Sequence, residues 1–183
     1  MSELSDIYTL IVHEFPEREI RALLVGGHAV NAHGYTRATQ DIDFIIDSDQ
    51  EELVSNVMKS HGYTNESRHE TVLFCMKPEA ALRIDFLKTD SSTMNTLWEK
   101  RNRLTLEKDA VVFYADIKHL IAMKLTALKG NFSRREHKDL PDILNLAQIH
   151  GLSFETDLQP LLQKFGTPEL ETKIKQSWEL FSS

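Results

Sequence analysis

Cysteine is the scarcest residue of this 183-residue chain, which contains only Cys75. No disulfide can therefore form within the chain, and a single thiol suits a reducing compartment. No apolar run approaches the ~20 residues that a helix needs to span a bilayer. The first residues include Glu3 and Asp6, which are unlike the start of a signal peptide. We therefore expect a cytoplasmic protein without membrane association.

Positive charge is also in short supply. The chain carries 21 Lys and Arg against 28 Asp and Glu, a formal net charge of −7 at pH 7. This balance argues against a broad basic surface for duplex nucleic acid, but it allows a local basic cleft. The sequence also lacks G-K-[ST], G-x-G-x-x-G and H-E-x-x-H. These absences exclude a P-loop, a Rossmann phosphate turn and a zincin metal site.

Hydrophobic residues make up 41% of the chain and charged residues 27%, which is typical of a globular domain. The patterning predicts an α/β (α+β) fold, with a mixed sheet core over residues 1–115 and a helical C-terminal portion over residues 116–183. No Gly/Ser linker separates the two parts, so we expect the helical portion to pack on the core. There is no internal repeat and no low-complexity tract.

Apolar spacing and turn residues predict the elements of the core. A first helix is expected from residue 4 to the position before Pro16. Asp47 supplies capping chemistry for a later helix that Gly62 ends. The other predicted helices cover residues 28–33 and 94–101. The predicted strands cover residues 21–25, 41–46, 71–76, 81–87, 104–106 and 111–114, with hairpin turns at 77–79 and near 108–109.

Beyond the core the pattern becomes helical. One helix is predicted over residues 117–129, with Asp116 as N-cap and Gly130 at its end. Asp139 is expected to cap the next helix, because Pro141 is tolerated in a first turn. Two further helices are predicted over residues 156–165 and 167–181.

Gly26 and Gly27 stand where a predicted strand becomes a helix. Glycine lets the backbone approach a ligand closely, and a helix N-terminus presents free N–H groups to phosphate. A plain tight turn explains the pair equally well.

Three aspartates form the strongest chemical pattern. Asp41 and Asp43 are two apart on a predicted strand and therefore share one face, while Ile42 and Phe44 share the other. Side-by-side carboxylates repel each other unless a cation lies between them, and Mg²⁺ is usually held by one or two carboxylates plus substrate phosphates. Asp85 alternates in the same way on a later strand. It is the candidate third ligand of a site for two Mg²⁺ ions. The alternative is a solvated strand end.

Lys124 lies inside an apolar stripe of the predicted 117–129 helix. A lysine in such a stripe must extend to solvent or find an anion. The first alternative is the commoner one, and the second predicts a lysine that reaches triphosphate oxygens. Arg134, Arg135 and Lys138 follow by a short turn and form a local cluster of cations.

In these motifs the sequence resembles the DNA polymerase β-like nucleotidyltransferase superfamily. The form G-G-x-A-x-x-x-x-G-x-x-R-x-T-x-D-I-D, from Gly26 to Asp43, is most similar to the minimal bacterial nucleotidyltransferases and, among them, to the AbiE-type toxin branch. That branch also has a helical lysine followed by an Arg and a Lys-Asp pair, which correspond to Lys124, Arg135 and Lys138-Asp139. The residue after the first glycine is Gly27 here, where many members have serine.

The resemblance implies Mg²⁺-dependent transfer of a nucleoside monophosphate from an NTP. Asp41, Asp43 and Asp85 would be the catalytic, metal-binding residues. Gly26 and Gly27 would cradle the phosphates, with Arg37 and Lys124 neutralising charge.

The acceptor is left open between an RNA 3′ end, such as that of tRNA, and a protein hydroxyl, with an antitoxin as a further partner. A non-catalytic nucleotide-binding or antitoxin-type module with the same fold is the alternative.

Overall fold

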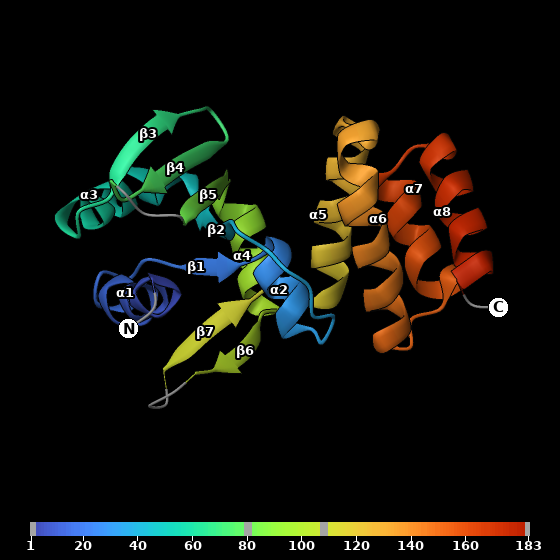
Figure 1. Ribbon diagram of the computed structural model, residues 1–183, viewed down its shortest axis with the longest axis horizontal. Helices are drawn as coiled ribbons and strands as arrows, with labels where there is room; N and C mark the ends of the chain where they lie inside the picture. Colours follow the sequence, from blue (N-terminus) through green and yellow to red (C-terminus); the bar gives the residue numbers. More distant parts are fainter. Residues whose placement is uncertain (1–2, 79–81, 107–109, 182–183) are drawn as a thin grey trace. The chain divides into compact units, whose positions relative to one another are not determined.

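The computed structural model describes residues 3–78, 82–106 and 110–181 (Figure 1). These residues form two compact units. The first extends to Ala32 and resumes from Arg37 to Asp116, and the second contains His33–Thr36 and the chain from Ile117 onward. The fold class is mixed α/β, as the sequence predicts.

A mixed seven-stranded sheet forms the centre of the first unit, in the order β3-β4-β5-β2-β1-β7-β6. The strands are β1 (Ala22–Leu24), β2 (Ile42–Asp47), β3 (Thr64–Arg68), β4 (Val72–Met76), β5 (Arg83–Thr89), β6 (Asn102–Thr105) and β7 (Val111–Tyr114). The β2–β5 and β1–β7 pairs are parallel, whereas the β1–β2, β3–β4, β4–β5 and β6–β7 pairs are antiparallel. Both predicted hairpins are therefore confirmed, although residues 79 and 107–109 of their predicted turns lie outside the described residues.

The α-helices of this unit pack apolar side chains against the sheet. They are α1 (Glu3–Glu17), α2 (Gly26–Ala32), α3 (Glu51–Ser60) and α4 (Ser91–Glu99), and the short 3₁₀ turn η1 (Ser48–Gln50) precedes α3. The Phe86 ring lies 6.0 Å from Phe15 of α1 and 5.8 Å from Phe44 of β2. All three are fully buried, so burial of these aromatic rings is a large favourable term in this core.

The second unit is helical. It contains α5 (Ile117–Gly130), α6 (Phe132–Ile149), the π-helical turn η3 (Phe154–Leu158), α7 (Gln159–Phe165) and α8 (Pro168–Phe181) (Figure 1). Its core is built from Leu, Ile, Ala and Phe side chains that include Ile121, Ile143 and Ile174. Within the described ranges, no helix combines the length and the apolar character needed to cross a membrane.

Two predicted helix boundaries are wrong. Helix α1 includes Pro16 but ends one residue later at Glu17, because proline lacks the N–H for the i→i−4 hydrogen bond and does not support a longer helix. Helix α6 begins at Phe132, where Asn131 caps it by accepting a hydrogen bond from the Arg134 N–H at 3.3 Å. Asp139 and Pro141 therefore lie inside this helix, and Asp139 is no N-cap.

Two further elements differ in detail. Asp47 caps η1, where its side chain accepts from the Asp49 N–H at 3.1 Å, and α3 starts after that turn. Strand β3 was not predicted at all, because Thr64–Arg68 is a run of polar residues without apolar alternation.

Candidate functional site

Strands β2 and β5 bring two of the three aspartates together. They run in parallel with Asp43 directly opposite Asp85, and Ile42 opposite Ile84. Ile42 and Ile84 are fully buried on one face of the sheet, so the aspartates lie on the other. Asp41 immediately precedes β2, and its side chain is 43% exposed.

Arg83 lies between two of these carboxylates. Its Nε donates to Asp85 Oδ1 at 2.7 Å, and its NH2 donates to Asp85 Oδ2 at 2.9 Å. The same NH2 lies 3.6 Å from Asp41 Oδ2. The guanidinium carbon also lies 5.2 Å from the centre of the Phe74 ring, on the neighbouring strand β4. A bidentate pair of this kind fixes the orientation of Asp85.

The electrostatics of Asp85 reflect two opposed effects. Its side chain is only 10% exposed, and this burial raises the pKa of the Asp85 carboxyl above its ordinary value. The hydrogen bonds and charge of Arg83 oppose that rise in pKa, while the charge of Asp41 adds to it. In turn, the bond to Asp85 raises the pKa of Arg83. The site is thus a group of mutually repelling carboxylates with one internal cation.

The donor set suits a hard cation. Carboxylate oxygens are the ligands that Mg²⁺ prefers, and Asp41, Asp43 and Asp85 provide them from two adjacent strands. Among the residues that the structure describes, no three His, Cys, Asp or Glu side chains are already gathered as a metal cluster. Arg83 provides the positive charge between Asp41 and Asp85 instead.

The glycine turn packs directly against these aspartates. Gly26 has a φ of +60°, and a β-carbon there would overlap the carboxylate of Asp43. Both facts require glycine. A β-carbon on Gly27 would overlap the side chain of Thr39, whose hydroxyl lies 3.5 Å from the Asp41 carbonyl oxygen. Thr39 thus fills the space that a serine at position 27 would need.

The loop after α2 is tied to that helix at Arg37. The Asn31 side chain accepts from the Arg37 N–H at 3.0 Å and donates to the Arg37 carbonyl oxygen at 3.0 Å. The Arg37 guanidinium donates to the Ala38 carbonyl oxygen at 3.1 Å. Burial lowers the pKa of His28, and the positive charge of Arg37 lowers it further. The guanidinium is therefore close enough for His28, the residue after the glycine pair, to experience its charge.

Lys124 belongs to the second unit, where it finds carboxylates. Its ammonium lies 2.9 Å from Asp139 Oδ1 and 2.6 Å from Asp142 Oδ2, and all three side chains are buried. Arg135 extends this network with a contact of 3.2 Å to Asp139 Oδ2. Lys124 therefore does not extend to solvent. Two of the three N–H donors of its ammonium are engaged within the unit.

The first unit thus contains six of the seven predicted site residues: Gly26, Gly27, Arg37, Asp41, Asp43 and Asp85. Arg83, Thr39 and Asn31 contact this group but were not predicted as part of it. Arg83 gave a sequence signal, since a basic residue two positions before Asp85 shares its strand face. Thr39 is part of the glycine–aspartate motif, whereas Asn31 gave no signal.

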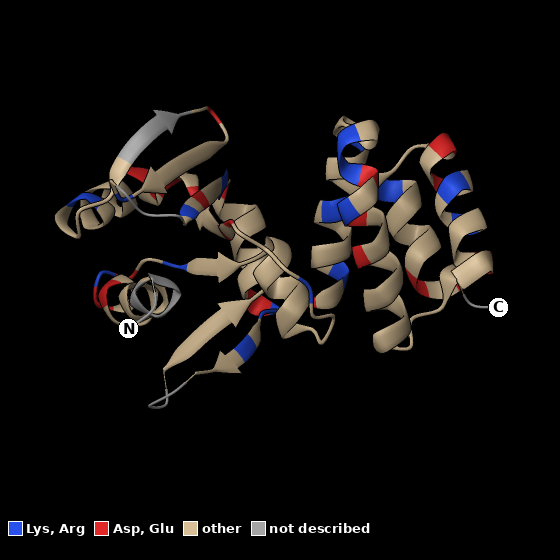
Figure 2. Cartoon of the chain, viewed as in Figure 1, with Lys and Arg blue, Asp and Glu red and all other residues tan. Residues whose placement is uncertain are grey.

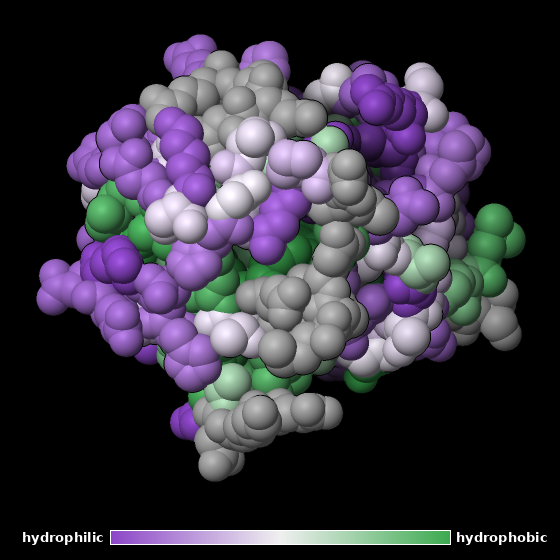
Figure 3. Space-filling view, turned by 60° about the vertical axis from the view of Figure 1, so that its left-hand side comes forward, coloured by the Kyte–Doolittle hydropathy of each residue, from purple (hydrophilic) through white to green (hydrophobic). Residues whose placement is uncertain are grey.

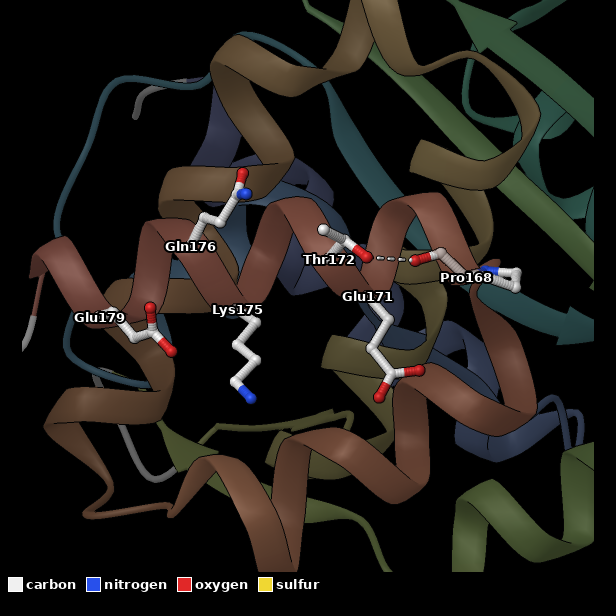
Figure 4. A pocket seen from close by; sticks show the side chains of 6 residues that line it. All are labelled: Pro168, Glu171, Thr172, Lys175, Gln176 and Glu179. Carbon is white, nitrogen blue, oxygen red and sulfur yellow. Dashed lines mark hydrogen bonds between the residues drawn. The ribbon is translucent and has the colours of Figure 1, made fainter.

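Two hollows lie elsewhere, and none of the predicted site residues lines either of them. A groove of about 420 Å³ follows the exposed side of α8 and is lined by Glu171, Lys175 and Glu179 among others (Figure 4). A cavity of about 330 Å³ in the first unit has largely apolar walls that include Trp98 and Phe113. Hydrophilic side chains cover much of the face seen in Figure 3, with hydrophobic ones gathered in a band between them.

Comparison with known proteins locates this site within a family. The model of the aminoglycoside-2''-adenylyltransferase family matches residues 8–119, which contain the glycine turn and all three aspartates. A sequence search of the characterised proteins finds no match.

Solved structures with a similar fold are nucleotidyltransferases or resemble them. ANT(2'')-Ia in complex with adenylyl-2''-tobramycin has a TM-score of 0.62 at 10% identity, and the similarity covers 100% of both chains. An antigenic nucleotidyltransferase-like protein from Paracoccidioides brasiliensis has a TM-score of 0.58 at 19% identity, over 94% of this chain and 92% of that one. The lincosamide antibiotic adenylyltransferase LnuA, bound to lincomycin, has a TM-score of 0.57 at 17% identity, over 81% of this chain and 98% of that one.

The structural similarities support the fold, and the family match spans more than half of the sequence. The chain therefore belongs to the aminoglycoside-2''-adenylyltransferase family and is a nucleotidyltransferase.

Proposed function

We propose that this protein transfers a nucleoside monophosphate from a Mg²⁺-bound NTP to a hydroxyl group of a small, amine-bearing molecule. The observation that carries the proposal is the pairing of Asp43 with Asp85 across β2 and β5, with Asp41 joined to the same group through Arg83. The glycine turn adjoins this group, since Gly26 packs on Asp43. The backbone proposed to bind phosphate and the carboxylates proposed to bind metal are thus adjacent in the first unit.

Asp41, Asp43 and Asp85 are the residues that would hold Mg²⁺. When bound, the metal neutralises charge on the triphosphate and on the developing pyrophosphate. The glycine turn presents backbone N–H groups to the phosphates, and Arg37 adds a positive charge beside it.

Asp85 is also the residue proposed to receive the acceptor's proton. The hydroxyl oxygen forms a bond to the α-phosphorus, and the bond from that phosphorus to the bridging oxygen of the β-phosphate breaks. Pyrophosphate leaves with the electron pair, and the hydroxyl proton moves to Asp85. Each carboxylate oxygen keeps a second lone pair beside its bond to Arg83, so Asp85 can still accept a proton.

The acceptor is inferred from the family and from charge. The family is named for transfer to the 2'' position of aminoglycosides, and two similar structures contain adenylyl-2''-tobramycin and lincomycin. A net charge of −7 favours the approach of a molecule that carries protonated amines.

Label transfer from α-³²P-labelled ATP tests the proposal. The protein is incubated with Mg²⁺ and, separately, with aminoglycosides, total RNA and total protein. We expect label on the amine-bearing small molecule. Asp41→Asn or Asp43→Asn should lower transfer by at least ~100-fold, because losing even a residue that supports a metal ligand costs 10–100-fold. Asp49→Asn, the same charge change at an exposed position, should have no effect.

A second candidate acceptor is an RNA 3′ end. Exposed Arg134 and Lys138 near the start of α6 favour it, since they form a local cationic surface on an acidic protein (Figure 2). Label on RNA that Arg134→Ala/Lys138→Ala abolishes would establish this acceptor. Label on protein alone would instead favour a toxin that modifies a protein hydroxyl, with an antitoxin as partner. NTP binding without any transfer would indicate a non-catalytic module.

A further inference from the structure

The loop that carries Arg37 is held by an unusual pair of hydrogen bonds. Both polar atoms of the Asn31 amide bond to the main chain of Arg37, one as acceptor and one as donor, each at 3.0 Å. The arrangement reproduces the two main-chain bonds that one residue of a β-ladder makes with its neighbour. It needs a side chain with a donor and an acceptor at its end. Aspartate offers only acceptors, and alanine offers neither.

Asn31 stands at the right place on α2 for this contact to matter. It follows His28 by three positions, so both residues face the same side of the helix. The Arg37 main chain therefore lies along that side of α2. Thr39, two residues after Arg37, packs on Gly27, so the loop that carries Arg37 passes beside the proposed phosphate turn.

The loop has a second point of attachment two residues later. Thr39 packs on Gly27 and reaches the carbonyl of Asp41, so the chain enters the metal-binding carboxylates from a fixed position. Thr39 thereby holds the end of the loop that leads to the aspartates. The main chain of Arg37 is held by Asn31, and the Arg37 guanidinium donates to the Ala38 carbonyl oxygen at 3.1 Å.

We infer that Asn31 is a positioning residue, which holds the Arg37 main chain so that its guanidinium is directed at the NTP phosphates beside Gly26 and Gly27. This inference rests on the proposed function. Asn31 touches no substrate itself and acts through Arg37. Without the Asn31 amide, Arg37 keeps its charge but its main chain is no longer fixed. Part of the free energy of nucleotide binding is then used to order the loop that carries Arg37.

A double-mutant cycle tests this coupling. The dissociation constant of Mg·ATP is measured by calorimetry for the wild type, Asn31→Ala, Arg37→Ala and the double variant. Arg37→Ala should weaken binding roughly 10- to 100-fold, as expected for loss of a charge-assisted contact. Asn31→Ala should weaken binding about 3- to 10-fold in the wild type, but by less than about 2-fold when Arg37 is already alanine.

A control and a direct readout separate positioning from general damage. Asn145→Ala removes a comparable bond, from the Asn145 amide to the Pro141 carbonyl at 2.8 Å in α6, and should leave Mg·ATP affinity unchanged. Hydrogen exchange at the Arg37 amide should accelerate in Asn31→Ala while exchange in β2 stays slow. Asn31→Asp, which keeps the acceptor for that amide, should preserve its protection.

The outcomes are distinct. If Asn31→Ala and Arg37→Ala weaken binding independently, or if only Arg37→Ala weakens it, the positioning role of Asn31 is overturned. If Arg37→Ala has no effect while Asp43→Asn abolishes Mg·ATP binding, the inference fails and the proposed nucleotide site survives. If the wild type binds no Mg·ATP, the proposed function itself fails.

Discussion

Arg83 lies within the group of carboxylates formed by Asp41, Asp43 and Asp85, and its position changes what binding of a metal ion there would involve. Arg83 makes two charge-assisted hydrogen bonds to Asp85 and a longer contact to Asp41. It is thus a cation among three carboxylates. A divalent ion at the same carboxylates would compete with it for the oxygens of Asp85. Binding of a divalent ion would therefore exchange one cation for another at Asp85, in addition to attracting the ion to Asp41 and Asp43.

Replacing Arg83 with Gln should have opposite effects on the metal-free and metal-bound protein. Loss of the pair leaves a mostly buried Asp85 without its cation and should cost about 1–3 kcal/mol, or roughly 2–12 °C in melting temperature. Removing the competitor should tighten Mn²⁺ binding, followed by electron paramagnetic resonance, by about 3- to 10-fold. Arg103→Gln, an exposed site with the same charge change, should do neither. Weaker Mn²⁺ binding in Arg83→Gln would show that Arg83 orients Asp85 for the metal.

His28 makes a second prediction at the level of one residue. Its pKa lies below the ordinary 6.5, because burial and the charge of Arg37 disfavour the imidazolium. As pH falls below 6.5, the unfolded chain takes up this proton before the folded one does. Stability is therefore lost as pH falls from 6.5 to the folded-state pKa and is constant below it.

Urea denaturation at pH 7.5 and pH 5.5 measures the effect. His28→Gln should lose less stability on acidification than the wild type, whereas His137→Gln, at a fully solvated position, should behave like the wild type. Nuclear magnetic resonance should show a higher His28 pKa in Arg37→Ala. An unchanged pKa there would mean that Arg37 does not lie near the glycine turn in solution.

At the scale of elements, Lys124 joins two helices. It leaves α5 and meets Asp139 and Asp142 of α6, and the three side chains are at most 6% exposed. Removing one partner of such a buried network leaves uncompensated charge, whereas replacing all partners with neutral groups is far less costly. The lysine was singled out by its position in an apolar stripe. That position is explained by two aspartates that no local pattern on α6 revealed.

Lys124→Met should therefore destabilise the protein by about 3–5 kcal/mol, or roughly 6–20 °C in melting temperature. Adding Asp139→Asn and Asp142→Asn should recover much of that loss. Lys129→Met, on the exposed side of the same helix, should change stability little. Calorimetry with Mg·ATP below the melting temperature then tests the nucleotide role. A loss of roughly 10- to 100-fold in the Lys124→Met variant would support it, and unchanged affinity would leave Lys124 as a structural residue.

The elements that sequence patterns revealed are those whose side chains carry the fold. Strands β2 and β5 were predictable because Ile42, Phe44, Ile84 and Phe86 alternate with polar residues and are fully buried. Strand β3 lies at the edge of the sheet and pairs only with β4, so polar residues suffice there. The start of α6 was missed because its first turns are charged and its cap, Asn131, resembles a loop residue.

In the candidate site, too, local patterns predict some residues and miss the contacts between others. Local spacing predicted Asp41 and Asp43 as a pair, and a second alternating strand predicted Asp85. The bonds from Asn31 to Arg37 and the packing of Thr39 on Gly27 depend on the path of the loop, which no periodic pattern encodes. Contacts that depend on the course of a loop become visible only once the fold is known.

At the scale of the whole molecule, net charge sets which substrates are attracted. With 28 acidic and 21 basic side chains, the protein repels a nucleotide at long range and attracts a molecule with protonated amines. In the proposed site, local cations such as Arg37 would bind the nucleotide at short range, where salt screens charges less. Added salt should therefore affect the two substrates differently, because a Debye length of about 10 Å at 0.1 M weakens long-range attraction first.

Raising KCl from 50 to 300 mM should increase the KM of an amine-bearing acceptor several-fold and leave the KM of Mg·ATP unchanged or lower. An RNA acceptor would also bind more weakly in salt, so the salt dependence alone does not distinguish it from an amine-bearing acceptor. Removing positive charges from the protein does, because the two acceptors carry opposite charge. Arg134→Ala/Lys138→Ala makes the chain more negative by two charges. It should leave the KM of an amine-bearing acceptor unchanged or slightly lower. A polyanion held by those residues would instead bind more weakly whatever its sequence, and its affinity would depend less steeply on salt. The KM of the acceptor that the protein modifies is measured for this double variant and for Lys59→Ala/Lys129→Ala, a control with the same change in charge. A higher KM in Arg134→Ala/Lys138→Ala than in the control would overturn the small-molecule proposal in favour of RNA.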